Sequence, residues 1–158
     1  NILFLIYGDG NELQRIKQRV SDEKISNVKI KGFIERKYLP YILNKSYINL
    51  LNYSDKKYNW QRGNSSNKLF EYMASGRPII ATIKTGYSLI KKYGCGVEVE
   101  NVTPMKLAEA IIDITRLNKQ EYMKICKNST EAAKDFDYEK LCNKLKVLIC
   151  TLLNKKWV

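Results

Sequence analysis

The sequence predicts an α/β fold built on an open, parallel, Rossmann-like sheet of about five strands, with helices on both faces and extra C-terminal helices. Short apolar segments alternate with amphipathic segments from residue 2 to residue 100. The first apolar segment, ILFLIY at residues 2–7, is continuous, which is typical of a parallel strand buried on both faces. The alternation of strands and helices is the order of right-handed βαβ units.

Each element follows from its own pattern. The predicted strands are apolar or alternate apolar with polar residues, and they are residues 2–7, 28–33, 47–53, 78–82 and 95–100. The predicted helices carry apolar residues at helical spacing. In chain order they are residues 12–20, 37–45, 65–75, 86–94, 104–117, 119–135 and 138–154.

Capping residues mark two of these helices. Thr103 and Pro104 form an N-cap and N1 pair. Ser65 and Ser66 are expected to cap the third helix, because a hydroxyl accepts a hydrogen bond from an unpaired first-turn amide. Gly76 suits a left-handed stop for the same helix, and Pro78 prevents it from continuing.

Composition indicates one globular domain, since 158 residues are too few for two ordinary ones. Lys and Arg outnumber Asp and Glu by 28 to 16, which gives a net charge of +12. This excess fits a solvated basic surface, contact with an anionic membrane or a phosphorylated substrate. No nucleic-acid partner is expected, because the basic residues are dispersed and the aromatic residues are not interleaved with Arg.

The chain has no histidine, and its four cysteines show no C-x-x-C spacing. A metal site is therefore not expected, and the cysteines are interpreted as reduced thiols of a cytosolic protein. No apolar run approaches the roughly 20 residues of a membrane-spanning helix. Because the sequence begins with Asn1 directly in a strand, we expect it to be part of a longer polypeptide.

Two strand-to-helix segments are candidate anion sites, at the sheet edge where open α/β folds bind ligands. The first, YGDGNE at residues 7–12, places Gly8 and Gly10 around Asp9, so the backbone can approach a phosphate at a helix N-terminus. Leu13 replaces the third glycine of the G-x-G-x-x-G fingerprint, so a tight structural turn is an alternative. The second follows the long loop at residues 54–66, which has no periodicity.

In this second segment, SSNKLFE at residues 65–71, cap residues, Lys68 and free amides come together. The Glu71 side chain leans back toward the helix N-terminus, and a carboxylate can accept two hydrogen bonds from the diol of a ribose. The alternative is a solvated glutamate on a polar face. That face is expected to carry Lys68, Glu71, Tyr72 and Ser75, opposite an apolar face of Leu69, Phe70, Met73 and Ala74.

The segments LIYGDGNEL, NVKIKGFIERKYLPYIL and SSNKLFEYMASGRPIIAT make residues 2–117 similar to the C-terminal, donor-binding half of a family-4 glycosyltransferase of the GT-B fold. The resemblance implies a nucleotide-sugar-binding domain at residues 1–137. It also implies that the helix at residues 138–158 packs on a missing N-terminal domain, which binds the acceptor. The donor-binding residues that it implies are Gly8, Asp9, Gly10, Gly32, Phe33, Ile34, Ser65, Ser66, Asn67, Lys68 and Glu71.

Within this set, the amides of Ser66, Asn67 and Lys68 would hold the donor pyrophosphate, Glu71 the ribose, and the backbone at residues 32–34 the base. Gly63 stands where the family has the first glutamate of its Glu-x7-Glu motif, so the contact with the donor sugar is missing or supplied otherwise. The catalytic residue stays unknown, because the usual His or Asp belongs to the missing domain.

The resemblance implies a retaining transfer of sugar from a UDP- or GDP-linked donor to an acceptor in cell-surface polysaccharide or glycolipid synthesis. No cofactor or metal is expected, because amides and cations would stabilise the leaving pyrophosphate. We also expect a cytoplasmic protein with peripheral contact to an anionic membrane. The alternatives are a non-catalytic nucleotide-sugar-binding subunit completed by another chain, and an epimerase of the same fold.

Overall fold

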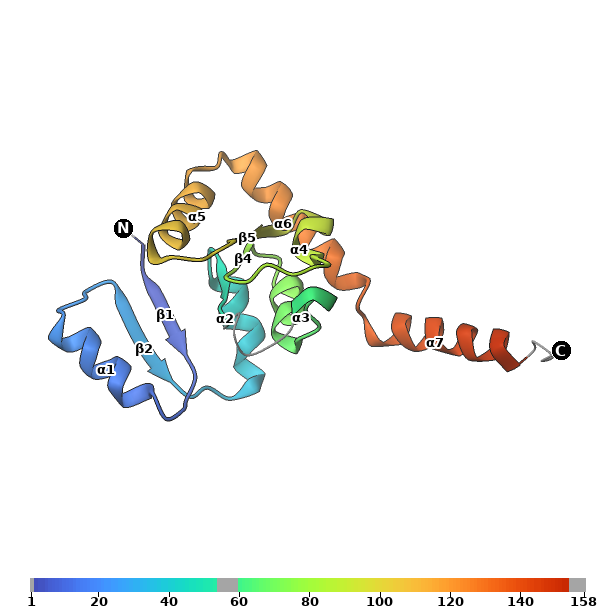
Figure 1. The fold of residues 1–158 in the computed structure, drawn as a ribbon, viewed down its shortest axis with the longest axis horizontal. Coiled ribbons are helices and arrows are strands. Elements are labelled where there is room, and N and C mark those ends of the chain that lie inside the picture. The colour runs from blue at the N-terminus through green and yellow to red at the C-terminus, as the bar shows by residue number, and fades with distance from the viewer. Residues whose placement is uncertain (1, 54–59, 154–158) are drawn as a thin grey trace. The chain divides into compact units, whose positions relative to one another are not determined.

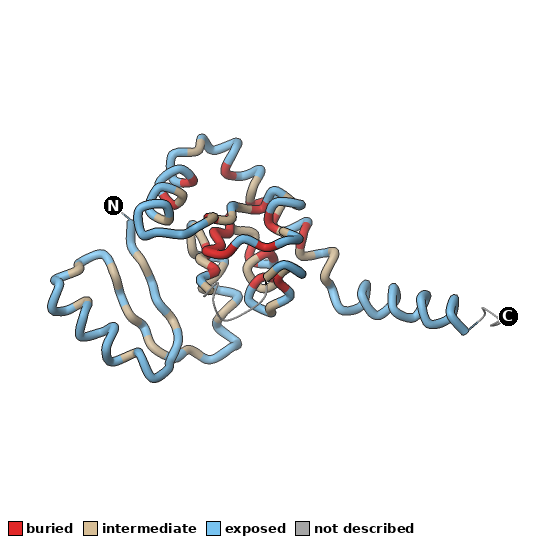
Figure 2. Tube along the Cα trace, viewed as in Figure 1, coloured by how far each residue is buried: buried red, intermediate tan, exposed pale blue. Residues whose placement is uncertain are grey.

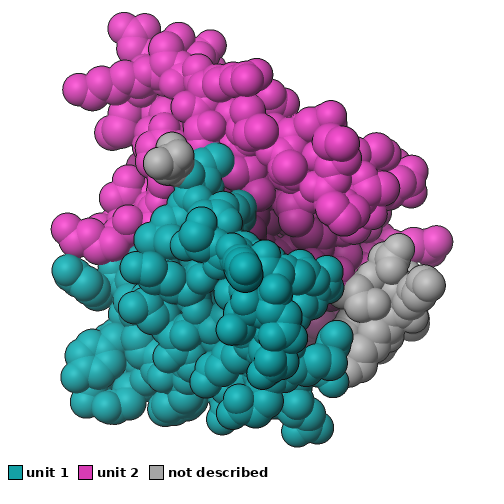
Figure 3. All heavy atoms as spheres, turned by 90° about the vertical axis from the view of Figure 1, so that its left-hand side faces the viewer, with its two compact units in different colours: residues 1–42 teal, residues 43–158 magenta. Residues whose placement is uncertain are grey.

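A computed structural model describes residues 2–53 and 60–153, which form two compact units at residues 1–42 and 43–158 (Figure 3). Part of the predicted loop at 54–66 and the end of the last predicted helix lie outside the described residues. The α/β class with parallel strands is confirmed. The hydrogen bonds join the five strands as a pair in the first unit and a triplet in the second (Figure 1).

The first unit is a β-α-β arrangement. Strands β1 (Phe4–Tyr7) and β2 (Val28–Gly32) pair in parallel with Phe4 opposite Val28, and α1 (Leu13–Asp22) packs on β2. The predicted burial of residues 2–7 on both faces is wrong, since Leu5 and Ile6 are 47% and 43% exposed. Within the first unit, β1 pairs with β2, and α1 packs on β2.

After β2, a 3₁₀ turn η1 (Arg36–Tyr38) leads into α2 (Leu39–Lys45), in which Pro40 occupies the second position, as predicted for an early turn. The helix α2 crosses the boundary between the two units.

The second unit contains the core. Its sheet has the order β3 (Asn49–Leu51), β4 (Ile79–Ala81), β5 (Gly96–Glu98), with Ile79 opposite both Asn49 and Gly96. Helices surround this sheet, and Figure 2 shows that the buried residues gather there. The core consists of Leu51, Leu69, Met73, Ile79, Ala81, Ile90, Cys95 and Ala132. Burial among these side chains raises the pKa of the Cys95 thiol to about 11, so it stays protonated at neutral pH.

The helices of this unit begin close to the predicted positions. They are α3 (Asn67–Ala74), α4 (Leu89–Tyr93), α5 (Pro104–Arg116), α6 (Lys119–Lys134) and α7 (Tyr138–Leu153), with a 3₁₀ turn η2 (Trp60–Arg62) before α3. The predicted Thr103 cap is confirmed, since its hydroxyl accepts the Lys106 amide at 3.2 Å. Helix α6 packs against both α3 and α4.

The helix α7 has no buried residue in its described length. Its apolar side chains Leu145, Leu148, Leu152 and Leu153 are 58%, 60%, 56% and 79% exposed. That this helix packs on another domain stays a prediction, and Trp157 and Val158, at its predicted end, lie outside the described residues. Across residues 2–53 and 60–153, no helix combines the length and the apolar character that crossing a membrane requires.

Gly76 ends α3 as predicted, with a left-handed φ of 66°. A Cβ on this residue would lie 2.8 Å from Thr130 Oγ1 of α6. We therefore expect Gly76→Ala to lower the free energy of unfolding by about 1–3 kcal/mol, measured by urea denaturation.

Gly94 provides the matched control, because its φ is 63° but a Cβ there would meet the Asn128 amide nitrogen at 3.1 Å. Gly94→Ala should therefore lower the free energy of unfolding by less than Gly76→Ala does. Adding Thr130→Ala to Gly76→Ala should restore part of the loss. Equal losses in both single variants, with no restoration, would contradict the steric explanation.

Candidate functional site

The helix α3 is fixed by two buried side chains one turn apart, Leu69 and Met73, which are 2% and 0% exposed. The predicted faces are partly wrong, because Ala74 is exposed and Ser75 is buried. Ser75 tolerates burial because its hydroxyl donates to the Tyr72 carbonyl at 2.6 Å and accepts the Asn49 side-chain amide at 2.9 Å. The helix therefore rests on β3 and α6, and its N-terminus follows η2.

The cap of α3 differs from the prediction. Ser66 is at the N-cap position with φ −69° and ψ 143°, but neither its hydroxyl nor that of Ser65 makes the cap hydrogen bond. Instead, the Ser66 backbone N–H donates to Asn64 Oδ1 at 2.9 Å. Asn64 competes successfully because its amide oxygen reaches the amide two residues later, as in an Asx turn.

This arrangement leaves polar groups at the start of α3 open. The Ser66 hydroxyl oxygen is buried and has no hydrogen-bond partner among the described residues. The amides of Asn67 and Lys68 lie in the first turn, where an α-helix supplies no acceptor. Unpaired amides and the helix dipole make this end of α3 suited to an anion.

Lys68 in the first turn and Glu71 in the second add charge of both signs to α3. Lys68 is exposed, and its ammonium lies 5.9 Å from the centre of the Tyr53 ring, which packs 5.1 Å from the Trp60 ring. Glu71 is half-buried, unlike the fully solvated residue of the alternative interpretation. Burial raises the pKa of the neighbouring Tyr72, and the charges of Tyr53 and Glu71 raise it further.

The backbone at Gly63 leaves little room for any side chain at this position. Gly63 has φ 93°, and a Cβ there would lie 3.0 Å from the Tyr87 carbonyl oxygen. Its N–H donates to the Trp60 carbonyl at 3.0 Å, which closes the η2 turn. A side chain at position 63 would therefore strain this turn and press on the loop after β4.

In the first unit, the structure brings the two predicted backbone segments together at the carboxyl ends of β1 and β2. The Gly8 N–H donates to the Gly32 carbonyl at 2.8 Å. Asp9 Oδ1 accepts the Gly10 N–H at 2.8 Å, so this carboxylate supports its own turn. Phe33 is 75% exposed and Ile34 is half-buried. Both the phosphate-binding and the turn interpretations of this segment stay open.

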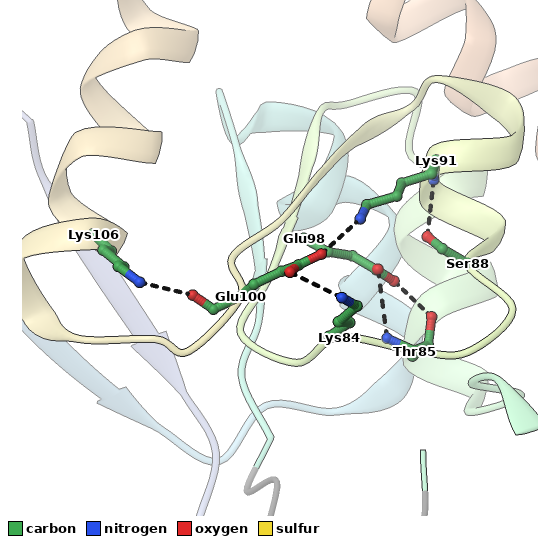
Figure 4. A network of polar contacts seen from close by, with 7 residues as sticks. All are labelled: Lys84, Thr85, Ser88, Lys91, Glu98, Glu100 and Lys106. Carbon is green, nitrogen blue, oxygen red and sulfur yellow. Dashed lines mark hydrogen bonds and ion pairs between the residues drawn. The ribbon is translucent and has the colours of Figure 1, made fainter. Parts of the chain in front are cut away.

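A polar network that was not predicted from the sequence joins the loop after β4, helix α4, and the end of β5 with the residues that follow it (Figure 4). The buried Thr85 hydroxyl donates to the Glu98 carboxylate at 2.7 Å. Two ammonium groups, of Lys84 and Lys91, contact the Glu100 carboxylate at 3.0 and 3.1 Å. These two hydrogen bonds lower the pKa of the Glu100 carboxyl group. Which residues meet in this network depends on the register in which β4 pairs with β5, and the sequence does not predict that register.

Within residues 2–53 and 60–153, no three His, Cys, Asp or Glu side chains are grouped as a metal site requires. The arrangement at α3 instead offers backbone amides, a cation and a carboxylate within one turn and a half of helix.

The family described as "Glycosyl transferases group 1" matches residues 1–116, which include both candidate segments and the whole of α3. The chain belongs to this family. No curated protein sequence matches it.

Solved structures of glycosyltransferases share the fold. Sucrose-phosphate synthase from Thermosynechococcus elongatus superposes with a TM-score of 0.72 and 21% identity, over 94% of this chain and 38% of that protein. HepE from Anabaena, solved in complex with UDP, superposes with a TM-score of 0.74 and 18% identity, over 95% of this chain and 41% of that protein. The pneumococcal O-GlcNAc transferase GtfA, solved with UDP and GlcNAc, superposes with a TM-score of 0.64 and 20% identity, over 97% of this chain and 30% of that protein.

These similarities establish one Rossmann-like half of the GT-B fold, as the sequence predicted. The chain spans less than half the length of each of these three proteins.

The Asn64 side chain, 9% exposed, gives a direct test of how α3 begins. Asn64→Ala removes the acceptor of the Ser66 N–H, and we expect it to lower the free energy of unfolding by about 1 kcal/mol. Asn64→Asp keeps an acceptor oxygen at the same place and should stay close to the wild type. Urea denaturation measures both, and equal losses in the two variants would show that the hydrogen bond contributes nothing.

Proposed function

We propose that this chain is the donor-binding part of a glycosyltransferase that moves a sugar from a nucleotide diphosphate sugar to an acceptor. The observation that carries the proposal is the family match over residues 1–116, which includes the open N-terminus of α3. The occurrence of UDP in the solved structures of HepE and GtfA supports a uridine donor, with a guanosine donor as the second choice.

The pyrophosphate of the donor would bind at the start of α3. The Ser66 N–H is taken by Asn64, so the groups that remain there are the amides of Asn67 and Lys68 and the Ser66 hydroxyl. Ser65 is exposed beside them, and Lys68 adds a positive charge.

The nucleoside would bind through separate groups. The Glu71 carboxylate would accept hydrogen bonds from both ribose hydroxyls. In the first unit, the Gly8–Gly10 turn and the backbone of residues 32–34 are the proposed donor contacts. Gly63 offers no side chain to the donor sugar, so another group must contact it.

The chemistry would rest on electrostatic stabilisation of the departing nucleoside diphosphate. First-turn amides and the Lys68 ammonium would meet negative charge as it develops on the leaving phosphate, without a metal ion. The sugar would be transferred with retention of its anomeric configuration, and an N-terminal domain would bind the acceptor.

A role in cell-surface polysaccharide or glycolipid synthesis fits the basic charge of the chain. At +12, the protein would bind peripherally to an anionic cytoplasmic membrane, and flotation with anionic liposomes in low and high salt tests this directly.

Titration calorimetry with UDP and GDP, in EDTA and then in magnesium, tests the proposed function. We expect binding of one of them with the same affinity in both conditions, because amides and Lys68 replace a metal ion. Cytidine diphosphate and inorganic phosphate serve as controls. Binding that occurs only with magnesium would contradict the role given to the α3 amides, and no nucleotide binding at all would overturn the proposed function.

Glu71→Gln tests the ribose contact, because it keeps the shape but replaces an acceptor oxygen with a donor. Hydrogen bonds to charged groups contribute about 1.5–3 kcal/mol, so the nucleotide affinity should fall roughly 10- to 150-fold. The 2′,3′-dideoxynucleotide should bind the wild type about as weakly as the ordinary nucleotide binds the variant.

The matched control is Glu109→Gln, which changes an exposed glutamate of α5 and should leave the affinity unchanged. Lys68→Ala should lower the nucleotide affinity less than Glu71→Gln does, because the amides remain. Its effect should fall with added salt, because ions screen the Lys68 charge. Normal binding by Glu71→Gln, or equal binding of the dideoxy ligand, would exclude the ribose contact.

A further inference from the structure

The turn η2, which precedes α3, is hydrogen-bonded to the loop after β4. The carbonyl oxygen of Trp60 in η2 accepts two backbone N–H groups, from Gly63 at 3.0 Å and from Gly86 at 3.1 Å. Gly86 is in close contact here, since a Cβ on it would lie 2.0 Å from the Gln61 carbonyl oxygen. The loop after β4 therefore fixes where η2 lies, and with it the entry to α3.

This loop is itself anchored at its start and in its middle. At its start, the Thr82 hydroxyl contacts Asn52 Oδ1 at 2.8 Å and accepts the Tyr53 N–H at 3.0 Å, which ties it to the end of β3. Next to Gly86, Thr85 is 7% exposed and its hydroxyl donates to the Glu98 carboxylate of β5 at 2.7 Å. The Thr85 N–H points to the other oxygen of the same carboxylate at 3.5 Å.

These contacts form a continuous path from β5 to the proposed phosphate site. Glu98 holds Thr85, Thr85 is followed by Gly86, and Gly86 fixes η2, from which the chain runs through Gly63 and Asn64 to Ser66. In Figure 4 the Glu98 and Thr85 side chains point toward each other from β5 and from the loop after β4.

We propose that Glu98 is a positioning residue for the donor-phosphate site, acting through Thr85 and Gly86 on the turn that leads into α3. The inference rests on the proposed function, because it takes the start of α3 as that site. Glu98 need not touch the ligand. Its carboxylate gives a buried hydroxyl an acceptor, and the loop would otherwise have to expose that hydroxyl or leave it unpaired.

The test compares four variants. Glu98→Ala removes the acceptor of the Thr85 hydroxyl, and Glu98→Gln keeps an acceptor oxygen there. Gly86→Ala displaces η2 directly, and Glu100→Ala is the matched control. Glu100 lies two residues beyond Glu98, and its carboxylate contacts Lys84 and Lys91 instead of Thr85. For each variant, the dissociation constants of UDP (or GDP, whichever binds the wild type), inorganic pyrophosphate and the free nucleoside are measured.

Glu98→Ala and Gly86→Ala should each weaken the nucleoside diphosphate and pyrophosphate by about three- to tenfold and leave the nucleoside unchanged, because the change is confined to the phosphate site. Glu98→Gln and Glu100→Ala should bind all three ligands like the wild type. Hydrogen exchange of the Gly63, Ser66 and Gly86 amides should become faster in Glu98→Ala and stay unchanged in Glu98→Gln and Glu100→Ala.

If the wild type binds the nucleotide, and Glu98→Ala and Gly86→Ala bind it equally well, this inference is overturned. The proposed function then stays intact. Equal weakening of nucleoside and pyrophosphate would overturn this inference as well, since it would indicate a general loss of structure. Should Glu98→Ala fail to fold, the comparison of Thr85→Val, which removes the hydroxyl that donates to Glu98, with Glu100→Ala decides in the same way. A wild type that binds no nucleotide overturns the proposed function, and this inference with it.

Discussion

The burial of Leu69 and Met73 fixes the orientation of α3. The two side chains are almost completely inaccessible, and each contributes about 1.5–3 kcal/mol by leaving water. With this side of the helix held against β3 and α6, its first turn follows η2, which is hydrogen-bonded to the loop after β4. The open amides of Asn67 and Lys68 and the half-buried Glu71 are therefore placed by apolar packing.

Local signals predicted much of this arrangement. The start of α5 at Thr103 and Pro104 and the left-handed stop at Gly76 follow from the chemistry of one or two residues, and the structure has both. The alternation of strands and helices gave the α/β class, because each element carries its own period. Elements that depend on a single segment of chain are the ones that a sequence describes well.

Where the predictions failed, a distant residue or a competing neighbour decided the outcome. Asn64 accepts the hydrogen bond of the Ser66 amide, although both serines satisfy the same capping rule. Ser75 is buried because Asn49, 26 residues away in sequence, supplies a hydrogen bond. The contact between Glu98 and Thr85 depends on the register that places β5 beside β4, which no local pattern around either residue predicts.

The double hydrogen bond at the Trp60 carbonyl has a consequence for how this protein can change in evolution. Both of its donors are glycines, and a Cβ at either position would contact the opposite loop, at the Tyr87 carbonyl from position 63 and at the Gln61 carbonyl from position 86. A side chain at position 63 would adopt a positive φ and approach the Tyr87 carbonyl, and one at position 86 would meet the Gln61 carbonyl. We therefore expect a substitution in either loop to require a compensating shift of the other.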